Sequence, residues 1–155
     1  MSVTNEAVRS LEPTQKQINI GLLIVRIAGS LSFLYHGSAI LFGAFGGPGL
    51  QGFSGFTHMP IAVAFLVGLA QLAGGLALLT GVLARLGAAC IAIVMAGAIL
   101  LVHLPHGFDG TKQGFEFALA YFLVAVAILV TGAGPYSLVA LLPGKSGPQV
   151  ATHTA

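Results

Sequence analysis

The chain has 155 residues, of which 56% are hydrophobic and only 6% are Asp, Glu, Lys or Arg. A soluble globular protein of this length needs far more charge on its surface, so the composition excludes that class. The formal net charge is +2, and the Lys and Arg residues do not form a basic cluster, so no surface for binding nucleic acid is predicted. These values indicate an integral membrane protein.

Four apolar runs fill most of the chain, at residues 20–42, 60–80, 86–102 and 115–131. Each is about long enough to cross a hydrocarbon layer roughly 30 Å thick. Unpaired backbone groups are costly in lipid, and the runs lack the alternation of barrel strands, so the spans should be helices. The predicted fold is an all-α membrane protein, a bundle of four transmembrane helices. We expect a polar N-terminal tail (1–17) without a secretory signal, a four-helix membrane domain (18–139) and a flexible C-terminal tail (140–155).

Lys and Arg are distributed unevenly between the two ends of the predicted bundle. Arg9, Lys16, Arg85 and Lys145 fall on the side of both tails, whereas only Lys112 falls on the other side. Cytoplasmic segments carry the excess of positive residues. Both termini are therefore predicted to face the cytoplasm, in a protein that crosses its membrane several times.

Polar side chains gather toward the opposite, outer face. They are four histidines and two carboxylates: His36, His58, His103, His106, Asp109 and Glu116. Imidazoles near neutral pH bind metals or exchange protons, so this face suits a metal, a proton-coupled redox molecule or an anion. A metal ion is not expected, because Pro105 interrupts the His-x-x-His pair and no third ligand pattern follows. Ordinary interfacial histidines are the favoured alternative.

Arg26 and Gln71 lie within predicted spans, where polar side chains are expensive and usually face a partner or a cavity. Arg26 either snorkels or staples the bundle, or it binds an anion or a quinone headgroup. Gln71 is expected to hydrogen-bond across helices. Glu116 begins its span and is expected to pair with His36 or another group of the outer face.

The remaining features concern packing and redox chemistry. Small residues repeat every four positions at Ala88, Ala92 and Ala96 and at Ala70 and Gly74, which allows helices to approach closely. No glycine run has the pattern that cradles phosphate, so no nucleotide is expected. Cys90 is the only cysteine, which excludes dithiol chemistry within the chain. A redox function would therefore require a separate electron carrier, and a membrane quinone is the natural candidate.

Five stretches follow one another in a specific order, namely LLIVRIAGSLSFLYHGSAILFGAFGGPGLQGF, LAQLAGGLALLTGVLARLGA, LLVHLPHGF, GFEFALAYFL and LVTGAGPYSL. Over roughly residues 20–138, this order resembles the DoxX family of small membrane proteins from the bacterial inner membrane. The resemblance implies a four-helix protein of the cytoplasmic membrane, in a family named after a subunit of an archaeal thiosulfate:quinone oxidoreductase, with relatives tied to thiol and oxidative-stress handling.

The family pattern maps onto particular positions of this chain, namely Arg26, His36-Gly37, Arg85, His103-Leu104-Pro105, Gly107-Phe108 and Glu116. Among these, Arg26, His36, His103 and Glu116 are the residues expected to bind the cofactor, a quinone. Two positions depart from the pattern: Gln71 stands where Glu is common, which removes a titratable partner for Arg26, and His106 stands where Asn is common.

Two functions follow as hypotheses. In the first, the chain is a membrane subunit of a quinone-linked redox system that acts on thiol or sulfur compounds. In the second, it is a noncatalytic anchor or assembly subunit of a larger membrane complex. The expected partners are membrane lipid and a larger membrane-protein or redox complex, with a homo-oligomer as a further alternative. A third class, a solute- or metal-handling membrane protein, rests only on the outer histidines.

Overall fold

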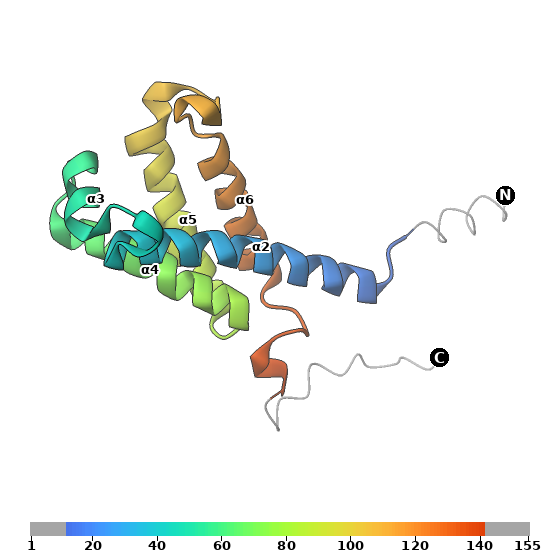
Figure 1. Cartoon of the computed structure of the whole chain (residues 1–155). Coiled ribbons are helices and arrows are strands. Elements are labelled where there is room, and N and C mark those ends of the chain that lie inside the picture. The colour runs from blue at the N-terminus through green and yellow to red at the C-terminus, as the bar shows by residue number, and fades with distance from the viewer. Residues whose placement is uncertain (1–11, 142–155) are drawn as a thin grey trace, which may run out of the picture.

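The computed structural model describes residues 12–141, and the elements in this range are helices joined by short connections. The four long helices are α2 (Gln15–Phe42), α4 (Ile61–Thr80), α5 (Ala84–Ala98) and α6 (Glu116–Thr131) (Figure 1). Helix α5 continues through a π-helical turn (Ile99–His103) and a 3₁₀ turn (Leu104–His106). The all-helical prediction is confirmed, and the four helices coincide with the four apolar runs. Most of the two predicted tails lies outside the described residues, as do Arg9 and Lys145.

Three stretches are long and apolar enough to cross a membrane: Gln15–Phe42, Ile61–Thr80 and Ala84–His106. Helix α6 is apolar but has only 16 residues. At about 1.5 Å per residue it extends roughly 24 Å, somewhat less than the hydrocarbon thickness of roughly 30 Å. The chain is thus a multi-pass membrane protein with three long spans and a shorter fourth helix.

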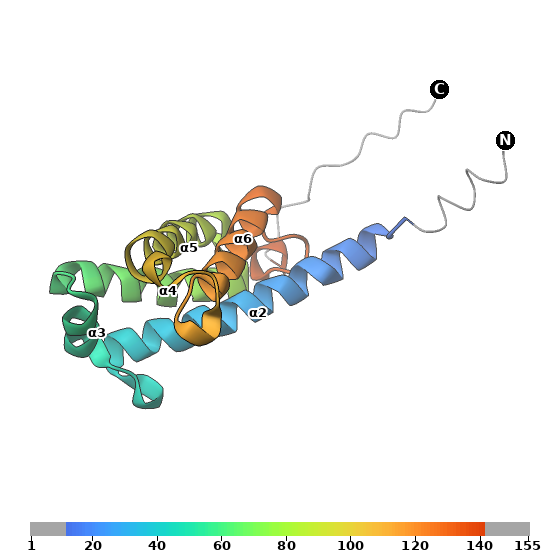
Figure 2. The same ribbon diagram turned by 90° about the horizontal axis from the view of Figure 1, so that it is seen from above.

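The helices form two pairs that cross each other. Helices α2 and α4 lie side by side, α5 packs against α6, and α4 and α5 connect the pairs. Figures 1 and 2 show that the α5–α6 pair runs steeply across the α2–α4 pair. The outer ends of the two pairs consequently diverge, a feature that a simple four-helix bundle does not have.

Small residues set how closely the helices approach. A Cβ atom added at Gly37 of α2 would lie only 2.5 Å from the backbone nitrogen of Leu72 in α4. Between α4 and α5, a Cβ at Gly87 would lie 3.1 Å from the carbonyl oxygen of Gly74. Ala88 and Ala92 are also buried, so the predicted small-residue packing is confirmed at these positions.

The large apolar side chains are divided between a thin core and the surface. Phe33, Leu78, Ile91 and Ile128 are at most 2% exposed, whereas many other large apolar residues cover the outside, including Ile93 at 73%. In water this much exposed apolar surface would favour aggregation. In a bilayer the same side chains contact lipid, as expected of spanning helices.

Both ends of α2 are set by local hydrogen bonds. Thr14 caps the N-terminus, because its hydroxyl accepts from the Gln17 N–H at 3.3 Å while the Thr14 N–H donates to the Gln17 side chain at 2.7 Å. This capping box begins the helix at Gln15, five residues before the apolar run. Gly43 ends it in the left-handed conformation (φ 67°) and donates its N–H to the Ala39 carbonyl.

The connection at residues 43–59, which reads as a glycine-rich loop, contains the additional helix α3 (Gly49–Thr57). Helix α3 packs on the ends of α2 and α4.

Candidate functional site

Arg26 is the central polar residue of the buried interface, with only 1% of its surface exposed. Its Nε donates to the carbonyl of Leu78 at 2.8 Å, and its Nη2 donates to that of Leu79 at 3.1 Å. Its Nη1 donates at 2.7 Å to each of two further carbonyls, those of Ala133 and Tyr136. One guanidinium therefore joins α2, the end of α4 and the segment that follows α6.

These acceptors explain why a cation is stable at this depth. Leu78 and Leu79 lie in the last turn of α4, where carbonyl groups have no partner within the helix and the helix dipole is negative. Arg26 thus acts as a C-terminal cap supplied by a neighbouring helix. Four of its five N–H groups are occupied in this way, which corresponds to the stapling role among the alternatives left open by the sequence.

Arg85 has a similar but weaker position. Its Nη2 donates to the carbonyl of Val130, in the last turn of α6, at 3.2 Å, and its side chain is exposed. It lines an open groove of about 510 Å³ together with Gly81, Leu83 and Gly132. Both arginines therefore serve the C-terminus of a helix that ends on the same side of the molecule.

Gln71 is 6% exposed within α4. Since the bonded donors of Arg26 go to main-chain carbonyls, the two side chains do not form the polar pair that the family pattern suggests at these positions.

The end of α5 holds two histidines in fixed orientations. Pro105 has no N–H to donate, so the α-helical hydrogen-bond pattern cannot continue through it. The backbone forms the π-helical turn before Pro105 and the 3₁₀ turn around it instead. His103 Nδ1 lies 2.7 Å from the Gln113 carbonyl oxygen, and His106 Nδ1 lies 3.1 Å from that of Val102. A carbonyl only accepts, so Nδ1 carries the hydrogen in each neutral ring and Nε2 is left as a proton acceptor.

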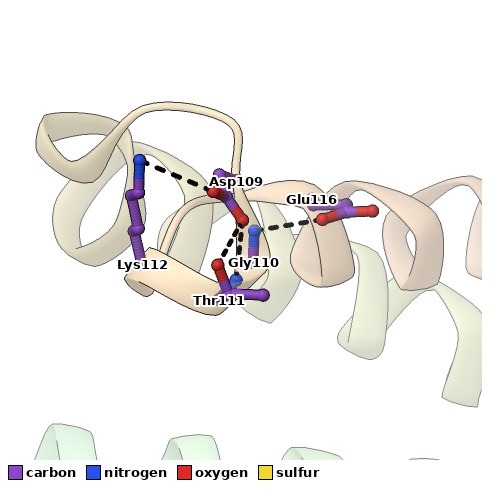
Figure 3. Close-up of polar contacts among 5 residues, drawn as sticks. All are labelled: Asp109, Gly110, Thr111, Lys112 and Glu116. Atoms are coloured by element: carbon purple, nitrogen blue, oxygen red, sulfur yellow. Dashed lines mark hydrogen bonds and ion pairs between the residues drawn. The ribbon is translucent and has the colours of Figure 1, made fainter.

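The α5–α6 connection is organised by its two carboxylates (Figure 3). Asp109 accepts from the Thr111 N–H at 2.9 Å and from the Thr111 hydroxyl at 2.7 Å, and lies 3.8 Å from the Lys112 ammonium. The Thr111 hydroxyl and, second, its N–H hold the pKa of the Asp109 carboxyl below its usual value. Glu116 accepts from the Gly110 N–H at 3.0 Å.

The predicted pairing of Glu116 with His36 is wrong. Lys112–Asp109 is the only ion pair among residues 12–141, and the Glu116 carboxylate is turned toward the backbone of its own loop. His36 instead lies on an exposed part of α2, with its ring 5.2 Å from that of Tyr35. The sequence also allowed Glu116 to pair with another group of the outer face. The group that it bonds is the main-chain N–H of Gly110, not a side chain.

The four predicted site residues therefore fall into three places. Arg26 lies where α4 ends, and His36 lies ten residues further along α2, toward α3. His103 and Glu116 flank the α5–α6 connection, which Figure 1 shows at the far end of the second helix pair. In the described part of the chain, no hydrogen bond or ion pair joins these four residues to one another. The same range contains no group of three His, Cys, Asp or Glu side chains suited to a metal ion.

Sequence reasoning missed the main-chain partners. The carbonyls of Ala133 and Tyr136 hold Arg26, and that of Gln113 orients His103. A main-chain acceptor leaves no residue signature. The one available signal was the turn-forming sequence Gly132-Ala133-Gly134-Pro135, which brings the chain back toward α2 after α6.

Comparison with known proteins identifies the family. The sequence model of the DoxX family matches residues 21–104, more than half of the chain, so the chain belongs to the DoxX family. The matched range contains Arg26, His36 and His103 and ends before Glu116. The chain is also similar to the protein named "Putative oxidoreductase CatD" of Bacillus subtilis (strain 168), at 27% identity over 117 residues, which are 76% of this chain and 83% of that protein. No solved structure matches the chain.

Proposed function

We propose that this chain is the membrane subunit of a redox system in a bacterial inner membrane, where a quinone accepts electrons from a thiol or an inorganic sulfur compound. A bound quinone would supply the electron acceptor: two thiols release two electrons and two protons when they become a disulfide, which balances reduction to the quinol. Two thiosulfates joined as tetrathionate release two electrons and no proton, so with this donor the two protons would come from water. The relative named as an oxidoreductase supports the redox class. The quinone is inferred from the absence of a dithiol in a chain with one cysteine. The sulfur donor is inferred from membership of the DoxX family, which is named after a subunit of a thiosulfate:quinone oxidoreductase.

The observation that carries the proposal is the fixed imidazole of His103. Its Nδ1 is held by the Gln113 carbonyl, so Nε2 is free to take a proton and deliver it to a quinone oxygen during reduction. His103 is half-buried at the end of a span, the depth at which a quinone headgroup would meet the aqueous boundary. Glu116 contributes indirectly to the orientation of His103, because it accepts from Gly110 and so holds the loop that contains Gln113.

The other two candidates take different roles in this proposal. Arg26 is a positioning residue, since its bonded N–H groups hold main-chain carbonyls. His36 is exposed on α2 and belongs to a separate contact with lipid or with a partner subunit.

The alternative is a noncatalytic anchor or assembly subunit. It is favoured by one specific observation: two of the three buried polar side chains in the described range, Arg26 and Ser30, bond to the chain itself. The Ser30 hydroxyl donates to the Arg26 carbonyl at 2.5 Å. In this alternative the arginines hold the helices in a rigid arrangement to which a partner subunit binds, and the partner alone transfers electrons.

The two functions are separated by His103→Ala, compared with His58→Ala as a matched exposed histidine outside the α5–α6 connection. The complex is extracted in native lipid and supplied with a quinone and either a thiol or thiosulfate, and quinol formation is followed spectroscopically. Loss of quinol formation in His103→Ala alone, with the complex intact on a native gel, supports the quinone-binding role. Unchanged quinol formation in His103→Ala, with complex assembly lost in Arg26→Ala, supports the anchor and rejects the first proposal.

A further inference from the structure

The connection between α2 and α4 differs in character from the other outer connection. Residues 43–60 contain no Asp, Glu, Lys or Arg, but they include Phe45, Phe53 and Phe56. The α5–α6 connection, by contrast, carries Asp109 and Lys112, which are both exposed. A connection placed in bulk water has no reason to exclude every charged residue and display aromatic rings.

Helix α3 presents two different faces. Leu50, Phe53 and Thr57 are half-buried on the side packed against the ends of α2 and α4. Phe56 is 65% exposed, and Gly55, beside it, has no atom within 4 Å of a Cβ built on it. Phe56 contacts Phe53 edge to face, with ring centroids 5.7 Å apart. The outward face of α3 is thus uncharged and uncovered in the monomer.

The turn before α3 continues this aromatic surface toward α2. Phe45 adopts a left-handed backbone conformation (φ 56°), which is costly for a residue with a Cβ. This conformation lets its ring stack on Tyr35 of α2, with centroids 5.1 Å apart, while 73% of Phe45 stays exposed. Phe42, at the end of α2, is 74% exposed. The aromatic surface therefore extends onto α2 through Tyr35, where it meets the exposed apolar side chains of that helix.

We propose that α3 and the preceding turn lie in the boundary between the lipid headgroups and the acyl chains, with Phe45 and Phe56 inserted into the lipid. The occupant of this surface is the outer leaflet itself, because the surface is continuous with the lipid-facing side of a spanning helix. Aromatic residues favour this layer, and a short helix with an apolar side lies along it. Gln51 is exposed and supplies a polar group that suits headgroups and water, whereas the Ser54 hydroxyl is satisfied within the chain because it donates to the Met59 carbonyl at 2.7 Å. This inference is independent of the redox proposal.

The chain has no tryptophan, which makes the depth of single positions measurable. Phe56→Trp and Phe45→Trp each introduce one fluorophore into the full chain, reconstituted in phosphatidylcholine and phosphatidylglycerol vesicles. Leu123→Trp, at a 56% exposed position in the middle of α6, is the deep control, and Lys112→Trp is the aqueous control. Quenching is measured with lipids brominated near the headgroup or near the chain end, and with acrylamide in the water.

Both phenylalanine positions should be quenched more strongly by the shallow bromine than by the deep one, the reverse of the order at Leu123→Trp. Their quenching by acrylamide should lie between those of the two controls. The proposal is overturned if both positions behave like Lys112→Trp, which would place α3 in water, or like Leu123→Trp, which would make it a re-entrant segment. The use of two exposed positions guards against one variant that disturbs the helix.

Discussion

Removal of the Arg26 side chain should destabilise the protein far more than removal of Arg85, the other arginine in the described residues. In Arg26→Ala the Leu78 carbonyl becomes a fully buried acceptor without a partner, which costs ~1–3 kcal/mol. The other three carbonyls are part-buried, and hydrogen bonds between membrane helices average about 0.6 kcal/mol each. The free energy of unfolding should therefore fall by roughly 3–5 kcal/mol.

Cys90 provides the assay, because it is the only thiol and lies half-buried in α5. A dye that fluoresces on reaction with thiols will report unfolding of the purified protein in detergent or bicelles as the temperature rises. At about 2–4 °C per kcal/mol for a domain of this size, Arg26→Ala should lower Tm by roughly 6–20 °C. The Tm of Arg26→Lys should lie between those of the wild type and Arg26→Ala, because an ammonium has three donors and lacks the planar fork of a guanidinium.

Arg85→Ala is the matched control. Its guanidinium is exposed and donates one bond of 3.2 Å, so its loss should change the stability by no more than about 0.5 kcal/mol. The reasoning fails if Arg26→Ala unfolds at the temperature of the wild type or of Arg85→Ala. Such a result would mean that water or lipid replaces the guanidinium at these carbonyls without loss.

Three further outcomes are expected. Gly37→Ala should lower Tm in the same thiol assay, because its Cβ would meet the Leu72 backbone, whereas Gly21→Ala, with no atom within 4 Å, should leave it unchanged or raise it by the equivalent of about 0.5–1 kcal/mol. The Asp109 carboxyl should titrate by carbon-detected NMR below the ordinary pKa of about 3.9, and Thr111→Val should raise its pKa; an unchanged pKa would show that the hydroxyl is not a donor to it. Since the pKa is lower in the folded state, this contribution to stability is present above pH ~4 and is lost as the pH falls through the folded value, so Thr111→Val should weaken the pH dependence of Tm below pH ~4.

The spanning elements were predictable because lipid imposes a strong constraint on sequence. Long apolar runs identified all four helices, and small residues identified the faces that pack. The start of α2 was less visible, since it depends on the capping box of Thr14 and Gln17 rather than on hydropathy. Helix α3 was not predicted, because three of its nine residues are glycine, and packing against α2 and α4 overrides their poor helix propensity.

The candidate site was predictable in depth but not in lateral position. Counting along a spanning helix gives the depth of His36 and of His103, and both indeed lie toward the ends of their helices that precede the outer connections. It does not give the crossing of the two helix pairs, which separates α3 and the end of α2 from the α5–α6 connection (Figure 2). The partners of Arg26 and His103 are main-chain oxygens, and these leave no trace in the residue types.

The buried Arg26 and the exposed Arg85 relate the direction of the helices to the stability of the fold. Helices α4 and α6 both run toward the side on which the positive-inside count places the cytoplasm, and each ends there with carbonyls that lack partners within the helix. Arg26 supplies these partners for α4 and Arg85 for α6. A guanidinium suits this task better than an ammonium because its fork reaches several carbonyls at once and it loses its charge less readily when desolvated. Arg85, which belongs to the positive-inside count, therefore also supplies a partner at the end of a returning helix. Arg26 lies within a span and does the same for α4, and this is why it can be essential to the fold without touching a substrate.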